Sequence, residues 1–363
     1  MAARQRVMNE ARPTIFVAIA SYSDPELPRT LDDCLATARY PENLRFGICW
    51  QYDTAAPIEL SRFRSDRRFC FSDYRVEDSQ GGSWARNVAQ AFYDGETYAL
   101  QVDSHTAFAP GWDSSLVSMM RTLPADKPLI TMIAPLFRVD DDGTARKRTE
   151  HGVRCGRLAD WNETSGWTPW FDWGQAATRR QTRNRFISGC FIFTIGPWTE
   201  EVRQDPDHYY WGEEFALTLR SYTHGYDFFL PDSIVAWHME HTEAPPRRHW
   251  EHGTEVISAK NKVAFERFRK LAFSDDPSEQ ESLGRFGLGP RRTLAEYERF
   301  AGIDLTNKRA HPDVYAGRSP DPVTIRKDDD WADCITCEEY LQTVESQGKT
   351  VWPQSCPGES GAT

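Results

Sequence analysis

Short apolar runs alternate with amphipathic stretches along most of this chain of 363 residues. The runs are rich in β-branched and aromatic residues, which is typical of buried strands. We predict strands over 14–20, 44–50, 68–71, 98–102, 129–134, 186–194, 227–231 and 233–237. Between them apolar residues recur at helical spacing, which predicts helices over 27–38, from 81–83 onward, and over 112–123, 215–222 and 255–273. This alternation predicts an α/β fold with a mainly parallel sheet covered on both faces.

The first predicted strand carries none of the common phosphate-binding signatures. It is not followed by Gly-x-Gly-x-x-Gly, and the chain has no Walker lysine loop. The pattern therefore argues against an ordinary dinucleotide enzyme or a phosphate-loop kinase.

A polar segment over 138–185 interrupts the alternation. It contains glycines, charges and four tryptophans: Trp161, Trp167, Trp170 and Trp173. Because it is too long for a simple turn, we predict a loop-rich insertion over the site. Aromatic residues that only pin a long loop to the core would explain the pattern equally well.

An acid and a histidine follow the predicted strand at 98–102. In an extended segment, residues two apart point to the same side, so Asp103 and His105 can converge on one divalent cation. An oxygen and a nitrogen ligand suit a borderline ion such as Mn²⁺. A strand-end acid and histidine that only cap the next turn are the alternative. Open α/β sheets bind their ligands at the carboxyl ends of the strands. Asp103 and His105 would lie at such an edge if this sheet is open.

A metal needs a further ligand, and His238 is the best candidate. It ends the apolar strand predicted over 233–237, which would also expose it at a sheet edge. His241 competes for the same role, and a purely structural histidine is an equal alternative for His238.

Two other groups are candidates for substrate contacts. Glu213 and Glu214 begin a predicted helix after an aromatic run, where a carboxylate acts as a cap, a base or an acceptor for sugar hydroxyls. Arg86 lies in the first turns of the helix that opens at 81–83. The amino-terminal end of a helix, together with a guanidinium, favours the binding of a diphosphate. The simpler interpretation of Arg86 is an arginine on the surface without a ligand.

Charge and composition narrow the function further. The net charge is −11, from 43 basic and 54 acidic residues, which argues against a general nucleic-acid binder. No apolar run approaches the roughly 20 residues of a membrane span, and the polar start lacks the apolar centre of a signal peptide. We therefore expect a cytoplasmic protein whose cysteines are mostly thiols. Whether Cys334, Cys337 and Cys356 bind zinc, form a disulfide or stay free is open.

Several blocks together resemble one family. They lie at 15–35, 47–53, 81–87, 101–113, 188–194, 209–238 and 286–304. In these blocks the sequence resembles the GlcNAc-transferase family (glycosyltransferase family sixty), whose known eukaryotic members modify hydroxyproline on a cytosolic ubiquitin-ligase subunit. The resemblance implies a GT-A fold, a Rossmann-like nucleotide-sugar domain. We expect a flexible terminus at 1–13, this domain at 14–308 and a partly irregular C-terminal extension at 309–363.

The resemblance also implies roles for single residues. Asp-Ser-His takes the place of the common Asp-x-Asp, as in mucin-type polypeptide GalNAc transferases, which implies Asp103, His105 and His238 as ligands of Mn²⁺ or Mg²⁺. The donor-binding residues implied are Ser21, Tyr22, Asp53, Arg86, Asp103 and Ser104, the first three near the uridine. The residues implied to border the sugar and acceptor are Trp211, Gly212, Glu213 and Glu214. Asp103 and the two glutamates are the catalytic candidates.

We therefore expect a metal-dependent transferase that moves a sugar, GlcNAc by resemblance, from a UDP-sugar to a hydroxyl, with retention at the anomeric carbon. The acceptor is a protein, a peptide or a small molecule, and GalNAc or glucose remain alternatives for the sugar. A metal-dependent hydrolase of a nucleotide sugar or glycan, and a glycan-binding module without turnover, are the competing interpretations.

Overall fold

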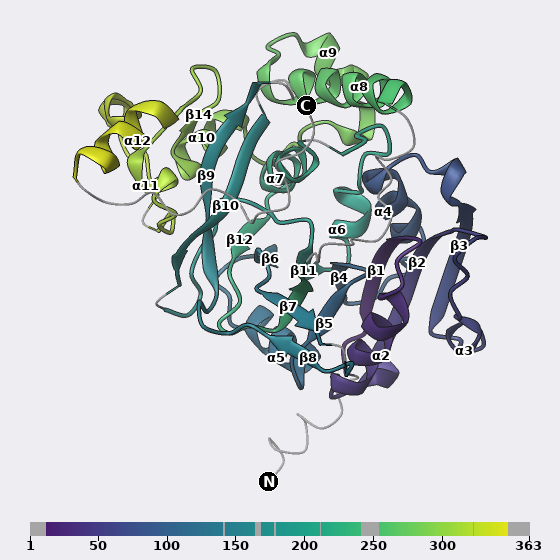
Figure 1. Cartoon of the computed structure of the whole chain (residues 1–363). Coiled ribbons are helices and arrows are strands. Elements are labelled where there is room, and N and C mark those ends of the chain that lie inside the picture. The colour runs from purple at the N-terminus through teal and green to yellow at the C-terminus, as the bar shows by residue number, and fades with distance from the viewer. Residues whose placement is uncertain are drawn as a thin grey trace, which may run out of the picture.

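A seven-stranded sheet forms the centre of the molecule (Figure 1). The computed structural model describes residues 12–347 except 141, 164–167, 178, 211, 241–253 and 322, and describes only the backbone of 254–256. The strand order is β12-β6-β11-β4-β1-β2-β3. The bounds are β1 Ile15–Tyr22, β2 Leu44–Tyr52, β3 Phe69–Arg75, β4 Tyr98–Asp103, β6 Pro128–Thr131, β11 Phe191–Ile195 and β12 Asp227–Phe229.

The sheet is mixed but mostly parallel, as the sequence predicts. Neighbouring strands pair in parallel except around β11, which runs antiparallel to both β4 and β6. Ala20 of β1 lies opposite Asp103 of β4, and Ser21 lies opposite Trp50 of β2. The carboxyl ends of β1, β2 and β4 therefore meet at one edge of the sheet, where this architecture binds ligands.

Helices cover both faces of the sheet. The bounds are α2 Leu27–Thr37, α3 Ser61–Arg64, α4 Gly82–Gln90, α5 Trp112–Met120, α6 Trp198–Glu201, α7 Glu213–Thr223, α8 Thr254–Phe273, α9 Pro277–Ser282, α10 Leu294–Ala301, α11 Pro312–Tyr315 and α12 Cys337–Ser346. Successive side chains of β1 point to opposite faces. Ile15, Val17 and Ile19 pack with α2 and α5, whereas Phe16 and Ala18 pack with α4. Because each face of β1 has its own helices, the strand is apolar along its whole length.

A second, four-stranded sheet brings a distant part of the chain to β4. Its order is β5-β13-β7-β8, with bounds β5 Thr106–Phe108, β13 Ala236–Met239, β7 Leu136–Val139 and β8 Ala145–Lys147. β13 pairs antiparallel with β5, so that His238 lies opposite Thr106. This register carries His238 to the end of β4.

The segment 138–185 is more regular than we expected. It contains a long antiparallel hairpin, β9 Arg154–Asn162 and β10 Thr168–Ala176. Leu158 and Trp161 are buried, whereas Trp170 is exposed. The buried residues of β9 include Cys155, Leu158 and Trp161, and the charged residues between them hide the strand in the sequence. Trp167 lies outside the described residues.

The described part of the predicted C-terminal extension packs on this hairpin (Figure 1). Tyr315 stacks on Tyr340 of α12, and the two-stranded β14 (Ile303–Asp304) and β15 (Arg309–Ala310) lie beside α10. Cys334 and Cys337 are free thiols, and the Cys337 thiol donates a hydrogen bond to the carbonyl of Ala159 in β9 at 3.2 Å. Cys356 lies outside the described residues. No described helix has the length and apolar character that a membrane crossing requires.

Candidate active site

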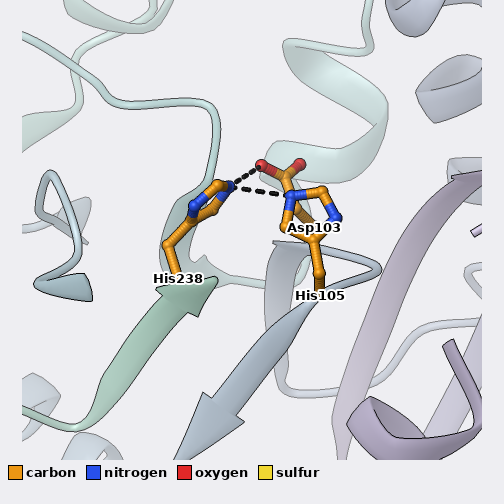
Figure 2. A group of neighbouring side chains, drawn as sticks. All are labelled: Asp103, His105 and His238. Carbon is orange, nitrogen blue, oxygen red and sulfur yellow. Dashed lines mark hydrogen bonds and ion pairs between the residues drawn. The ribbon is translucent and has the colours of Figure 1, made fainter. Parts of the chain in front are cut away.

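Three side chains with metal-binding atoms meet at the carboxyl edge of the sheet (Figure 2). Asp103, His105 and His238 each place one ligand atom within 4.8 Å of the others. His238 Nε2 lies 3.3 Å from Asp103 Oδ2 and 2.9 Å from His105 Nε2. Within the described part of the chain this is the one such group of three or more residues.

The route by which Asp103 and His105 converge differs from our expectation. They do not share an extended segment, because β4 ends at Asp103 and a turn at Ser104 and His105 precedes β5. The turn, rather than the alternation of a strand, directs both side chains to His238. His241, the competing candidate, lies outside the described residues.

Asp24 fixes the orientation of His105, and sequence reasoning missed it. Its Oδ2 lies 2.7 Å from His105 Nδ1 and accepts a hydrogen bond from Ser104 Oγ at 2.5 Å. Its Oδ1 accepts one from the Glu26 amide at 2.9 Å. A proton on Nδ1 that faces a carboxylate leaves Nε2 for the site centre. The signal that could have identified Asp24 is its place two residues after the end of β1.

The charge states of Asp24, His105 and Asp103 depend on their neighbours. Burial raises the pKa of Asp24, but its bonds to His105 and Ser104 outweigh that effect, so the pKa is lowered. Burial lowers the pKa of His105, and the bond to Asp24 reverses the shift. Burial likewise raises the pKa of Asp103, whereas the Arg86 guanidinium holds it well below its usual range. The aspartates are therefore carboxylates at neutral pH.

Arg86 links the three-residue group to α7. It lies in the second turn of α4, and its Nη2 donates to Asp103 Oδ1 at 2.9 Å while its Nη1 donates to Glu213 Oε1. A Cβ at Gly189 would lie 2.9 Å from Arg86 Nη1 and 3.0 Å from Glu213 Oε1, so a side chain there would push against this pair. A buried guanidinium between two carboxylates is a preorganised cation at the sheet edge.

The two glutamates at the start of α7 have different environments. Glu213 faces Arg86, whereas Glu214 Oε1 accepts hydrogen bonds from the Gly189 amide at 2.5 Å and from Ser188 Oγ at 3.3 Å. Burial, with the charge of Glu213, raises the pKa of Glu214 to about 7. Glu214 therefore exchanges a proton near neutral pH while Glu213 is held by a cation.

The remaining predicted residues lie along the same edge or beside it. Ser21 and Tyr22 end β1, and Asp53 directly follows β2. The Ser21 hydroxyl is buried without a hydrogen-bond partner among the described residues. Ser104 donates a hydrogen bond from its hydroxyl to Asp24, and its contact with the donor stays a prediction.

Gly212 brings the hairpin β9–β10 to the site. It has a φ of 76°, and a Cβ there would lie 2.5 Å from Thr168 Cγ2 of β10. The insertion that we predicted over the site therefore touches the turn before Glu213. Trp211, the remaining candidate, lies outside the described residues.

The environment of Glu214 predicts a pH-dependent stability difference. In the folded protein its pKa is about 7, against an ordinary value of 4.5, so between these values the folded state keeps a proton that the unfolded state releases. The free energy of unfolding therefore falls as pH rises through this window, by up to about 3 kcal/mol. We expect Glu214→Gln to gain stability over the wild type from pH 4.5 to pH 7, and no further above it.

Urea unfolding of both proteins at pH 5 and pH 8 measures this difference. Glu281→Gln, on the exposed face of α9, controls for the substitution itself. A Glu214→Gln difference that is the same at both pH values would contradict the raised pKa.

A family model described as Glycosyltransferase (GlcNAc) matches residues 14–67 and 58–307, which include Asp103, His105, His238, Arg86 and both glutamates of α7. The chain belongs to this glycosyltransferase family. The match ends close to the start of the predicted C-terminal extension and includes the hairpin β9–β10. A search of curated proteins finds no match.

The solved structure of GalNAc-T7 shares the fold. A crystal structure of GalNAc-T7 with UDP, GalNAc and Mn²⁺ superposes with a TM-score of 0.51 at 14% identity, over 80% of this chain and 56% of that chain. S. aureus TarS 1-349 in complex with UDP-GlcNAc gives 0.41 at 15% identity, over 75% of this chain and 71% of that one. The chain thus spans little more than half of the GalNAc-T7 chain. The α/β arrangement of this family member is that of a GT-A glycosyltransferase.

Proposed function

We propose that the protein is a metal-dependent glycosyltransferase that moves GlcNAc from UDP-GlcNAc to the hydroxyl of a protein, peptide or small-molecule acceptor, with retention. The observation that carries this proposal is the convergence of Asp103, His105 and His238 beside Arg86 at the carboxyl edge of the sheet. The family description supports the sugar, and the GalNAc-T7 structure, which contains UDP and Mn²⁺, supports the kind of donor and cofactor.

The three-residue group fits a divalent ion. One carboxylate oxygen and two imidazole nitrogens form a donor set that suits Mn²⁺, with Mg²⁺ as the harder alternative. Asp24 supplies the outer hydrogen bond that ligating histidines usually have. When bound, the metal supplies a Lewis acid for the negative charge that develops on the departing UDP.

The side chains around the group bind and orient the substrates. Arg86 would share its charge between Glu213 and the donor diphosphate. Ser21 and Tyr22 at the end of β1, and Asp53 after β2, would contact the uridine. Trp211, Gly212 and the two glutamates would border the sugar and the acceptor. Because Arg86 holds Glu213 in place, this carboxylate would accept hydrogen bonds from sugar hydroxyls.

Retention of the anomeric configuration determines from which side the acceptor attacks. The bond from the anomeric carbon to the UDP oxygen breaks, and a bond to the acceptor oxygen forms on the same face of the sugar. The acceptor proton passes to the leaving phosphate, so no side-chain base opposite the leaving group is required. Glu213 or Glu214 would orient the sugar or the acceptor at this step.

The test is UDP release from a panel of UDP-sugars with Mn²⁺, with and without a chelator, and with no acceptor. We expect slow release from UDP-GlcNAc above the other sugars, abolished by the chelator. Fast release without an acceptor would favour the hydrolase alternative. Absence of both UDP release and nucleotide binding would contradict the proposal.

Asp24→Asn tests the support of His105. We expect it to weaken Mn²⁺ affinity about 10–100-fold, because an amide holds the Nδ1 proton of His105 less firmly than a carboxylate does. Titration calorimetry with Mn²⁺ measures the affinity. Asp32→Asn, an exposed change on the neighbouring helix α2, is the matched control. Equal affinity in Asp24→Asn and the control would show that Asp24 does not position the ligand.

A further inference from the structure

Three buried glutamines form a network of hydrogen bonds beside the candidate active site. Gln90 of α4, Gln101 of β4 and Gln204 are 3%, 2% and 2% exposed. Gln101 is two positions before Asp103 in β4, and residues two apart in a strand point to the same face of the sheet. The side chain of Gln101 therefore lies on the face that carries Asp103, but deeper in the core. Because a buried amide is costly unless it is hydrogen-bonded, the partners of Gln101 show what it holds in place.

Gln101 uses both ends of its side-chain amide. Its Nε2 donates a hydrogen bond to the carbonyl of Gly189 at 3.0 Å, and its Oε1 accepts one from Nε2 of Gln204 at 3.3 Å. Because a carbonyl only accepts, the amide nitrogen of Gln101 must face Gly189, and this fixes the orientation of the side chain. Gln101 therefore ties the turn at Gly189 to the segment at Gln204.

Gly189 is the point at which this network reaches the candidate active site. Its amide donates to Glu214 Oε1 at 2.5 Å. On its other side it lies against the pair of Arg86 and Glu213, since a Cβ at Gly189 would come within 3.0 Å of both side chains. A small displacement of Gly189 would therefore change the contacts of both glutamates of α7.

The other end of the network reaches α4, the helix that carries Arg86. The backbone amide of Gln204 donates to Gln90 Oε1 at 2.9 Å, and the Gln204 carbonyl accepts a hydrogen bond from Asn87 Nδ2 at 2.6 Å. Both partners belong to α4, where Asn87 directly follows Arg86. The network therefore joins α4, β4 and the turn at Gly189, and these segments carry or contact Asp103, Arg86 and the glutamates of α7.

We propose that Gln101 is a positioning residue, which holds Gly189 and through it the carboxylates of Glu213 and Glu214 on the side of the site where the sugar would be transferred. Glutamine suits this position because it offers a donor to Gly189 and an acceptor to Gln204 at once, whereas an apolar residue of similar volume offers neither. This role rests on the proposed function. None of the hydrogen bonds of the network includes a proposed metal ligand, so turnover should depend on Gln101 more than donor binding does.

Gln101→Met tests the proposal, because methionine has a similar shape and lacks both hydrogen-bonding groups. We expect the turnover number for UDP release from UDP-GlcNAc to fall about 10–100-fold, while the Kd values for UDP and Mn²⁺, measured by calorimetry, stay as in the wild type. Thr194→Val is the matched control, since Thr194 is buried in the neighbouring strand β11 and its hydroxyl donates to the carbonyl of Pro128 at 2.8 Å. The control should keep the wild-type turnover. Gln204→Leu removes the other half of the network and should lower turnover in the same direction, which keeps the test decisive if Gln101→Met does not fold.

A second measurement follows Gly189 itself and needs no turnover. In protein labelled with ¹⁵N-glycine, we expect the amide hydrogen of Gly189 to exchange about tenfold or more faster in Gln101→Met than in the wild type, and at the wild-type rate in Thr194→Val. Unchanged exchange at Gly189 in Gln101→Met, or wild-type turnover in that variant, would overturn the proposal. If the wild type released no UDP while the exchange still differed, the proposed transfer reaction would fail and the positioning of Gly189 by Gln101 would stand.

Discussion

Replacement of Asp103 by alanine is expected to reduce sugar transfer by about 10³-fold or more while the protein stays folded. The change removes the carboxylate that lies 3.3 Å from His238 Nε2, and with it one of three proposed metal ligands. A bound metal supplies several kcal/mol of transition-state stabilisation, and each 1.36 kcal/mol is about tenfold in rate. The fold should persist because Asp103 is the last residue of β4 and its side chain is 23% exposed.

The measurement is UDP release with Mn²⁺, beside calorimetric Mn²⁺ binding and circular dichroism. Asp73→Ala is the matched control, because Asp73 is also a strand aspartate paired with an arginine, Arg64, but lies away from the site in β3. Near-normal turnover of Asp103→Ala with Mn²⁺ would refute the assignment of the metal site.

Much of this site was predictable because its parts lie at strand ends. The strands β1, β2 and β4 are mostly apolar, since helices bury both faces of the sheet, and such runs are recognisable without a structure. Each run ends in polar residues, so Asp103 and Asp53 are placed at one sheet edge by the topology alone.

Other features depend on contacts between distant residues. The bond between Asp24 and His105 spans 81 positions, and the pair of Arg86 and Glu213 spans 127. No local sequence pattern predicts such a pairing, because it forms only when β1, β4 and α7 pack together. Trp161 illustrates a different difficulty, because β9 mixes charged residues with buried apolar ones. Judged by the polarity of its residues alone, such a strand cannot be told from a loop.

Arg86→Met is expected to lower the free energy of unfolding by about 3–5 kcal/mol and to remove transfer activity. The substitution keeps the apolar stem but leaves two carboxylates, Asp103 and Glu213, facing each other without the guanidinium between them. Arg86 and Glu213 are only 15% and 12% exposed, so loss of the guanidinium leaves the Glu213 charge largely out of water and uncompensated, which costs this much. Urea unfolding at pH 7 measures the effect.

The control for Arg86→Met is Arg64→Met, which removes an exposed pair with Asp73 whose side chains are 38% and 43% exposed. We expect that change to cost less than about 1 kcal/mol. In the double variant Arg86→Met/Glu213→Gln, one orphaned charge is removed, so part of the lost stability, about 1–3 kcal/mol, should return. Transfer should not return with it, because the cation that would face the diphosphate is still missing. Recovery of both stability and transfer in the double variant would mean that Arg86 only neutralises Glu213, whereas recovery of stability alone separates its structural role from its role toward the donor.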